Sequence, residues 1–340
     1  MTTLPTPAPA FLAAHRLALE SALRQTIAGT PGPIANAARY VMGWQDADGQ
    51  PTGRGGKRLR PLLCLFAAES LGGTIDRAMP AAVAVEVVHN FSLVHDDVQD
   101  GDEERHGRPA AWTLHGVAQA INLGDYFHTA AVRALMDGPG PLAARAAALS
   151  VLLEATTQMI EGQWSDISFE ACSTVAVDDY VAMTAAKTGA LLGAPLEMGA
   201  IFAGADRDRA TALGRWGRQI GIAFQAHDDY LGIWGDPEIT GKSNANDIMR
   251  KKKTLPIVLA LQDPAAAEVI TGAYGTGTLP ESAVRDVLAA LEATGSNRAC
   301  RALADRYATQ ADRLLDGIFP DGGTRARFRQ VADYIVSRSS

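Results

Sequence analysis

Residues 77–100 read RAMPAAVAVEVVHNFSLVHDDVQD. Apolar side chains return every three to four positions along this stretch, which is the spacing of one face of an α-helix. It ends in an acidic cluster, in which Asp96 and Asp100 are four residues apart and therefore share one helical face. The sequence predicts a helix over Arg77–Val98, with an apolar body and a C-terminal end that carries carboxylates.

The same periodicity covers most of the chain. Other alanine- and leucine-rich segments that we expect to be helical are Phe11–Ala28, Pro61–Leu71, Val117–Met136, Leu142–Ser165, Tyr180–Phe202, Arg207–Tyr230 and Ser282–Leu315. Glycine and proline breakers separate these segments, strand signals are scarce, and no change in composition divides the chain. We therefore predict one all-α domain over residues 11–340, preceded by a disordered N-terminal segment, residues 1–10.

Composition excludes several classes of protein. The formal net charge of −7 argues against a nucleic-acid partner, and three widely separated cysteines suggest neither a disulfide framework nor a zinc site. No uncharged apolar run approaches the roughly 18 residues of a membrane span, and the first residues lack the order of a signal peptide. We expect a soluble, cytoplasmic protein with no stable membrane insertion.

A second acidic pair lies far along the chain. Asp228 and Asp229 follow another apolar helical segment, more than 120 residues after the first cluster. Like charges on one helical face repel each other, and carboxylates near a helix C-terminus oppose its dipole. A solvated acidic helix end is the plain alternative for one such cluster, but two of them suggest bound cations. Oxygen-only ligands suit Mg²⁺, which commonly bridges one or two carboxylates to substrate phosphates.

Cationic residues accompany the acidic clusters. Residues 55–61 read GGKRLRP, in which Lys57 and Arg60 are three apart; we expect them on one face of the following helix, as an anion cradle or else as ordinary surface charges. Further polar and charged residues are Arg105, Arg108, Lys187, Thr188, Lys242, Asp247, Lys252 and Lys253. Carboxylates and many cations in one acidic protein describe a pocket for Mg²⁺ and diphosphate.

Several motifs occur in a recognisable order from about Gly55 to Pro256. They are GGKRLRP, HNFSLVH (89–95) leading into DDVQD, Gly124-Asp125, Gly162-Gln163 with Asp166, Lys187-Thr188-Gly189, Phe224-Gln225 with Asp228-Asp229, Gly241-Lys242, Asp247, and Lys252 through Pro256. This order resembles the trans-isoprenyl diphosphate synthase (polyprenyl synthetase) family, which includes the farnesyl and geranylgeranyl diphosphate synthases.

The resemblance implies a fold, a cofactor and an assembly. The fold would be a bundle of roughly ten or more helices around a central cavity, of the isoprenoid synthase type. Each active site would hold Mg²⁺, with about three ions as the family implies, and the chain would form a homodimer. The metal ligands would be Asp96, Asp97, Asp100, Asp228 and Asp229.

The resemblance also assigns residues to two substrates. Isopentenyl diphosphate would bind Lys57, Arg60 and His89. The allylic diphosphate would be held through Mg²⁺ and by Arg105, Lys187, Lys242 and Lys252. Thr188 and Gln225 would orient diphosphate or stabilise a cation, or else are packed polar residues. The groups expected to carry catalysis are Asp96, Asp97, Asp100, Arg105, Lys187, Asp228 and Lys242.

The chain departs from the family pattern at two positions. Gly232 stands where the second cluster usually has a third aspartate, a loss we expect to be tolerated because Mg²⁺ needs few protein carboxylates. His106 stands where the family usually has a second arginine, so isopentenyl diphosphate is held more weakly or Arg108 contributes. His95 and His227 each precede an aspartate pair, and we interpret them as packing or supporting residues rather than ligands.

Product length is expected to depend on the residues before the first cluster. A hydrocarbon anchored at Asp96 would run back along the helix, and five positions correspond to roughly 7 Å. Phe91 and Ser92 stand five and four positions upstream. One aromatic at the fifth position resembles the archaeal type of twenty-carbon producer, so we predict geranylgeranyl diphosphate. Leu123 or Phe127 on a facing helix could instead close the tunnel, and Phe91 could be a core residue.

Other activities remain open at this stage. A farnesyl diphosphate synthase or a longer-chain synthase would use the same motifs. A terpene cyclase on the same fold would add no isopentenyl unit, and the complete second diphosphate site that the resemblance implies, Lys57, Arg60 and His89, speaks against it. A non-catalytic partner subunit should have eroded aspartates, whereas both pairs here are intact.

Overall fold

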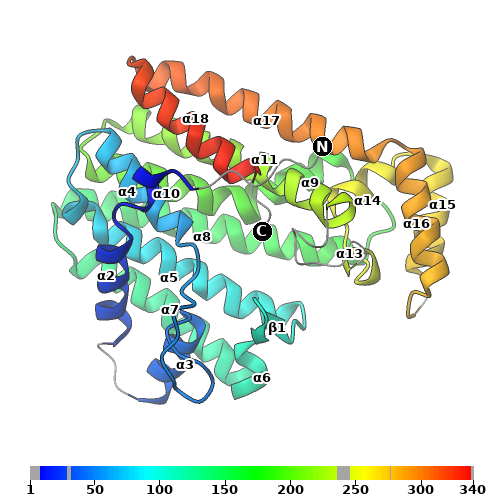
Figure 1. Ribbon diagram of the computed structural model, residues 1–340, viewed down its shortest axis with the longest axis horizontal. Coiled ribbons are helices and arrows are strands. Elements are labelled where there is room, and N and C mark those ends of the chain that lie inside the picture. Colours follow the sequence, from blue (N-terminus) through cyan, green and yellow to red (C-terminus); the bar gives the residue numbers. More distant parts are fainter. Residues whose placement is uncertain (1–7, 29–31, 236–245, 276, 338–340) are drawn as a thin grey trace. The chain divides into compact units, whose positions relative to one another are not determined.

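The computed structural model describes residues 8–28, 32–235, 246–275 and 277–337 (Figure 1). Helices make up nearly all regular structure in these ranges, and the exception is a hairpin of two short strands, β1 (Glu104–Arg105) and β2 (Arg108–Pro109). The all-α prediction is confirmed. No described helix is both long enough and apolar enough to cross a bilayer.

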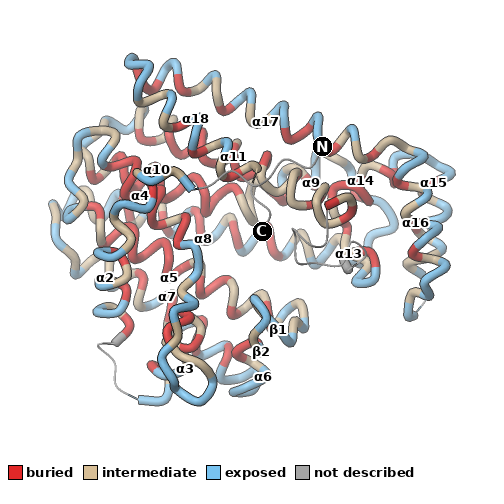
Figure 2. The backbone as a smooth tube through the Cα atoms, viewed as in Figure 1, coloured by how far each residue is buried: buried red, intermediate tan, exposed pale blue. Residues whose placement is uncertain are grey.

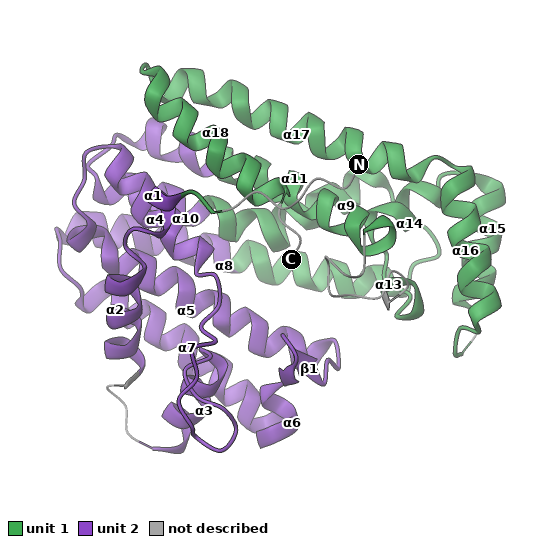
Figure 3. Cartoon of the chain, viewed as in Figure 1, with its two compact units in different colours: residues 1–9, 157–193, 215–340 green, residues 10–156, 194–214 purple. Residues whose placement is uncertain are grey.

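The chain forms two compact units that interleave along the sequence (Figure 3). Unit 2 contains residues 10–156 and 194–214, and unit 1 contains residues 157–193 and 215–340, together with residues 1–9. The acidic cluster at Asp96 belongs to unit 2, and the pair at Asp228 belongs to unit 1. The expectation of a single domain over residues 11–340 stays a prediction.

Unit 2 is built around helix α5 (Ile75–Gln99), which packs against α4 (Leu59–Ser70) and α7 (Val117–Asp137). Most of α5 is buried (Figure 2), which explains its nearly continuous apolar sequence from Ala81 to Val88. The other elements wholly in this unit are α1 (Ala10–Ala13), α2 (Arg16–Ala28), α3 (Pro33–Val41), β1, β2 and α6 (Ala111–His115). This packing fixes the end of α5, and therefore its carboxylates.

Three helices contribute residues to both units: α8 (Leu142–Glu170), α10 (Ala190–Phe202) and α11 (Arg207–Trp234). Unit 1 also contains α9 (Val177–Thr184), the π-helical turn η1 (Ala185–Gly189), α13 (Asn246–Met249), α14 (Leu255–Ala260), α15 (Pro264–Tyr274), α16 (Glu281–Ala293), α17 (Ser296–Ile318) and α18 (Gly322–Ser337). One buried cluster of this unit joins Tyr180, Ile222 and Leu255, from α9, α11 and α14. This cluster lies beside the second acidic pair.

Two long predicted helices are interrupted. The segment 180–202 contains the five-residue π turn η1, which places Lys187 and Thr188 in a wider turn than an α-helix has. The segment 282–315 breaks because Gly295 adopts a left-handed conformation with φ 70° and starts a new helix. Helical periodicity persists across such single-turn breaks, so the sequence pattern does not show them.

Candidate active site

At the acidic end of α5, the carboxylate of Asp97 is bound by Arg105. Asp97 is only 4% exposed; its Oδ1 accepts a hydrogen bond from Nε of Arg105 at 2.6 Å and lies 2.6 Å from Nη2 of the same guanidinium in an ion pair. Burial raises the pKa of Asp97 to about 6, against the opposing charge and hydrogen bond of Arg105. Asp96 and Asp100, four residues apart on the same helix end, are half-buried.

A two-residue hairpin turn positions Arg105. The turn residues His106 and Gly107 have φ values of 52° and 67°, and Arg105 faces Arg108 across the two strands. Arg108 donates to the Gln45 carbonyl at 2.8 Å and stacks over the Tyr40 ring at 4.0 Å. His106, which stands where the family usually has a second arginine, therefore lies at the tip of the turn. Arg108 is held by Gln45 and Tyr40, which are not part of the acidic cluster.

The cationic segment before α4 differs from the prediction. Lys57 and Arg60 were expected on one helical face, but α4 begins at Leu59 and Lys57 precedes it. The expectation is wrong because Arg58 adopts a left-handed conformation with φ 53°, which turns the chain just ahead of the helix. Lys57 is exposed and Arg60 is half-buried.

Arg60 and His89 meet between α4 and α5. Nη1 of Arg60 lies 3.1 Å from Nε2 of His89, and because a guanidinium only donates, Nε2 accepts and carries no proton. Burial and the nearby charges of Arg60 and Arg105 lower the pKa of His89 well below its ordinary value. Two of the three residues predicted to bind isopentenyl diphosphate are thus in direct contact.

Of the residues predicted to set product length, Phe91 contacts rings on α5 and α7, and Ser92 bonds within α5. The Phe91 ring lies 4.9 Å from the His95 ring and 5.4 Å from the His128 ring, measured between centroids. The Ser92 hydroxyl donates to the His89 carbonyl at 2.9 Å. Leu123 and Phe127 on α7 are buried. These contacts leave both the tunnel floor and the core role of Phe91 as predictions.

His95 is a packing residue, as interpreted from the sequence. Its Nε2 lies 3.2 Å from the Ile121 carbonyl of α7. A Cβ at Gly124 would stand 2.1 Å from the same nitrogen, so Gly124 leaves room for the ring. This close approach is the physical reason for a glycine in the Gly124-Asp125 pair.

The second acidic pair, near the end of α11, also has one carboxylate fixed by hydrogen bonds. Oδ2 of Asp229 accepts from the Tyr180 hydroxyl at 2.5 Å and from the Leu255 amide at 2.7 Å, and Oδ1 accepts from Gln225 at 2.8 Å. Burial raises the pKa of Asp229 to about 6, although these three bonds oppose the rise. Asp228, the neighbouring carboxylate, is half-buried.

The π turn supplies two further predicted residues. Lys187 donates to Asp166 of α8 at 2.5 Å, and a Cβ at Gly162 would stand 2.4 Å from the Lys187 amide nitrogen, so Gly162 admits the turn. Thr188 donates to Oε1 of Gln225 at 3.0 Å and so joins the hydrogen-bond chain to Asp229. π turns inside helices are frequent at functional sites.

The remaining predicted residues lie after α11. Lys252 is half-buried in the segment before α14, and Lys242 lies outside the described residues. The Oδ2 atom of Asp247 would be 3.1 Å from a Cβ at Gly232, so an aspartate there would crowd a second carboxylate against it. The glycine at this departure therefore leaves space for Asp247.

Sequence reasoning missed two residues that hold this site. Tyr180 is buried and bonded to Asp229, and Arg58 is buried at the start of α4. Tyr180 is 49 positions from its partner and carried no local signal. The four-residue spacing between Gln225 and Asp229 is a signal that could have revealed their contact.

The carboxylates at the two helix ends can be compared with the ligands that Mg²⁺ prefers. Carboxylates of Asp96, Asp100 and Asp228 are oxygen donors of the type Mg²⁺ prefers. Within the described ranges, no three acidic, histidine or cysteine side chains gather closely enough to hold an ion by themselves. Because Mg²⁺ commonly takes one or two carboxylates and completes its shell with water and phosphate, each acidic helix end by itself supplies donors that fit an ion bound together with a diphosphate.

Comparisons with known proteins agree with the motifs. A model of the polyprenyl synthetase family matches residues 49–291. The chain is 39% identical over 338 residues to a (2E,6E)-farnesyl diphosphate synthase of Mycobacterium tuberculosis H37Rv, covering 98% of this chain and 93% of the relative. It is 40% identical over 286 residues to a geranylgeranyl diphosphate synthase of the same organism, covering 83% and 81%.

A solved structure shares the fold. The crystal structure of a polyprenyl synthetase from Streptomyces coelicolor A3(2) matches with a TM-score of 0.90 and 38% identity, covering 96% of this chain and 99% of that one. The chain therefore belongs to the polyprenyl synthetase family of trans-isoprenyl diphosphate synthases. It is a trans-prenyltransferase, which confirms the activity class that the motifs predicted.

Proposed function

We propose that the enzyme joins isopentenyl diphosphate head to tail to an allylic diphosphate, in a magnesium-dependent reaction whose main product is geranylgeranyl diphosphate. The observation that carries the proposal is the contact between Arg60 and a neutral His89. A guanidinium held in this way, with Lys57 nearby in sequence, suits a second diphosphate. A terpene cyclase has no use for such a second site.

We divide the carboxylates into primary and secondary contacts for magnesium. Asp97 is held through Oδ1 by Arg105, which leaves Oδ2 for a metal ion. Asp229 accepts three protein hydrogen bonds, which leaves one lone pair on Oδ1. We assign the primary contacts with magnesium to Asp96, Asp100 and Asp228, with about three ions as the family implies, and secondary contacts to Asp97 and Asp229.

The chemistry follows from these charges. When bound, magnesium neutralises the charge that develops on the departing diphosphate. Arg105, Lys187, Lys242 and Lys252 hold that diphosphate as the allylic C–O bond breaks. The isopentenyl double bond then attacks the allylic cation to form the new C–C bond, and a proton leaves to the released diphosphate. Thr188 and Gln225, already hydrogen-bonded to each other, orient the diphosphate through their dipoles.

Product length rests on the residues before Asp96. The relatives include both a farnesyl and a geranylgeranyl diphosphate synthase, so similarity alone does not choose between fifteen and twenty carbons. An aromatic residue, Phe91, five positions before Asp96, followed by the small Ser92, favours a twenty-carbon product. The ring contacts of Phe91 with His95 and His128 hold the aromatic side chain in place.

Assembly and location complete the proposal. We expect a homodimer, and exposed apolar side chains on α8, Ile160, Trp164 and Ile167, at 51%, 77% and 39% exposure, are candidates for its interface. We propose a cytoplasmic location, a compartment in which thiols such as those of Cys64, Cys172 and Cys300 stay reduced.

One incubation separates the synthase from a cyclase. Purified enzyme and Mg²⁺ receive farnesyl diphosphate either alone or with labelled isopentenyl diphosphate, and the extracted products are counted and chromatographed. The proposal predicts label in a twenty-carbon diphosphate and no product from farnesyl diphosphate alone. A cyclic or eliminated hydrocarbon without added isopentenyl diphosphate, and no label incorporated, would contradict it.

A further inference from the structure

We propose that Arg16 and Arg58 are positioning residues that hold the loop at residues 53–58, and with it Lys57, ready for isopentenyl diphosphate. Neither arginine is assigned to the substrate itself. The inference rests on the proposed role of Lys57 and Arg60 as the isopentenyl diphosphate cradle. All of its residues belong to unit 2.

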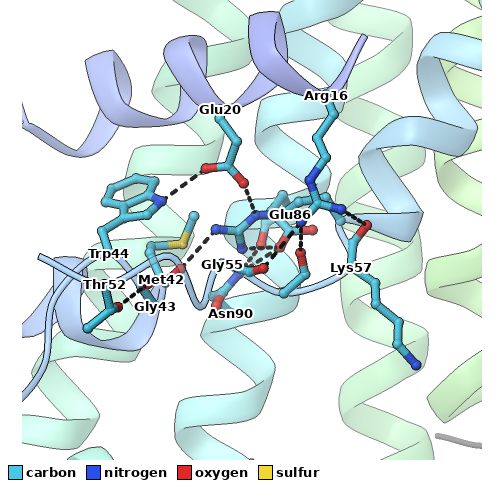
Figure 4. Close-up of polar contacts among 12 residues, drawn as sticks. Arg16, Glu20, Met42, Gly43, Trp44, Thr52, Gly55, Lys57, Glu86 and Asn90 are labelled. Carbon is cyan, nitrogen blue, oxygen red and sulfur yellow. Dashed lines mark hydrogen bonds and ion pairs between the residues drawn. The ribbon is translucent and has the colours of Figure 1, made fainter. Parts of the chain in front are cut away.

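Arg58 is buried and shared among three elements. It is only 4% exposed, and its three nitrogens donate to Glu20 Oε1 at 2.7 Å, Glu86 Oε1 at 2.7 Å and the Met42 carbonyl at 2.8 Å (Figure 4). The left-handed backbone of Arg58 is unfavourable for a residue with a side chain. These contacts stabilise it, so the turn that separates Lys57 from α4 depends on them.

The two carboxylates connect the loop to the helices on either side. Glu86 lies on α5, one turn before His89, and Asn90 donates to its Oε1 at 3.3 Å. Glu20 lies on α2 and accepts from the Trp44 indole at 3.0 Å. Burial disfavours ionisation of Glu20, but the hydrogen bond and charge of Arg58 outweigh it and lower its pKa. Arg58 therefore fixes the position of the loop relative to α5, the helix that carries His89.

Arg16 holds the backbone of the same loop directly. Its Nη2 donates to the carbonyls of Gly56 at 2.8 Å and Gly55 at 3.3 Å, and its Nη1 to that of Lys57 at 3.4 Å. Figure 4 shows the Lys57 side chain extending away from these contacts. One guanidinium thus fixes three consecutive peptides that contain a flexible glycine pair, while the lysine side chain points away from that guanidinium.

The start of the loop is tied as well. Gly43 has φ 75°, and a Cβ there would stand 2.6 Å from the Arg54 carbonyl oxygen. The Thr52 amide donates to the Trp44 carbonyl at 2.9 Å, and its hydroxyl to the Gly43 carbonyl at 2.8 Å. With both ends fixed, the loop is ordered before the substrate binds, which reduces the entropy lost on binding.

Steady-state kinetics of Arg16→Ala test the inference. We expect the KM for isopentenyl diphosphate to rise about tenfold, with kcat and the KM for the allylic diphosphate near those of the unaltered enzyme. Arg16→Lys should recover part of the loss. The control is Arg24→Ala, on the same helix, whose side chain lies over the Trp44 ring at 4.7 Å and is not assigned to the loop; its constants should stay near the original values.

A double variant separates positioning from general damage. If Arg16 acts through Lys57, then Arg16→Ala should add little to the KM of a Lys57→Ala enzyme. Equal rises in both Michaelis constants, or a full additional effect in the Lys57→Ala background, would overturn the positioning role while leaving the cradle intact. An unchanged KM for isopentenyl diphosphate in Lys57→Ala itself would overturn the assignment of Lys57 to the cradle, and the inference with it.

Discussion

The hydroxyl of Tyr180 donates a 2.5 Å hydrogen bond to Oδ2 of Asp229, and the same oxygen accepts from the Leu255 amide. The buried carboxylate of Asp229 thus links α9, α11 and the start of α14. Asp229 adjoins Asp228 in the sequence, and Leu255, at the start of α14, comes three residues after Lys252. The fixed carboxylate sets the position of its neighbours on both segments. Asp229 acts as an anchor of the site in addition to any contact with metal.

Tyr180→Phe should therefore weaken this unit without removing any charge. A hydrogen bond to an ionised group contributes about 1.5–3 kcal/mol, so the free energy of unfolding should fall by about that amount. Urea unfolding of the two proteins, followed by circular dichroism, measures the difference. Tyr307→Phe, a partly buried tyrosine at the edge of the same cluster, is the control. Equal losses in the two variants would show that the bond to Asp229 contributes nothing special.

Arg58→Ala should be strongly destabilising, because it leaves Glu86 buried without its partner. Removing one partner of a buried pair typically costs about 3–5 kcal/mol. Glu86→Gln in the Arg58→Ala background should recover part of this loss, since the buried charge is then gone. A double-mutant cycle of unfolding free energies checks the coupling, and strictly additive effects would mean that the pair does not interact in the folded chain.

His89 should make the fold sensitive to mild acid. The pKa of His89 in the folded chain is well below 6.5. As the pH falls below about 6.5, the unfolded chain therefore binds a proton at His89 while the folded chain does not, and this favours unfolding. Stability from this group is complete above that pH and declines below it. In His89→Gln, whose amide oxygen can still accept from Arg60, the decline between about pH 7 and pH 5 should be shallower. The free energy of unfolding is measured by urea unfolding at each pH. An equally steep decline in His89→Gln and in the unaltered protein would contradict this prediction.

Phe91 and Ser92 should control product length in opposite directions. Phe91→Ala removes the proposed aromatic floor and should lengthen the product, and Ser92→Phe adds a large side chain and should shorten it to fifteen carbons, because side-chain volume sets the space left for the hydrocarbon. Leu123→Ala tests whether the facing helix α7 closes the tunnel instead. Chromatography of the dephosphorylated alcohols gives the distribution. The same distribution in both α5 variants would show that the floor lies elsewhere.

The sequence alone was sufficient for the long helices and the charged ends. Helix α5 was predicted as Arg77–Val98 and observed as Ile75–Gln99, because a long buried helix leaves a strong apolar pattern. The contact between Asp97 and Arg105 joins residues eight apart, and both had been assigned to one site. A contact between charged residues can be predicted from the sequence when, as here, the two residues are close in the chain and follow the end of a helix.

The supporting contacts could not be predicted, because their partners are distant in the sequence. Arg58 takes a left-handed conformation that its residue type disfavours, and Glu20 and Glu86, 38 and 28 positions away, stabilise it. The π turn at Lys187 depends on the close approach that Gly162 permits. Such features follow from tertiary packing rather than from local propensity.

Turnover of Asp96→Ala and Asp228→Ala tests the central proposal, that the carboxylates of both acidic helix ends are required for magnesium-dependent catalysis. Each variant is assayed for labelled isopentenyl diphosphate incorporated with farnesyl diphosphate over a series of Mg²⁺ concentrations, after circular dichroism shows an unchanged fold. We expect turnover to be abolished in both variants, and also in the unaltered enzyme treated with EDTA. Near-normal turnover in either variant, with the same dependence on Mg²⁺, would contradict it.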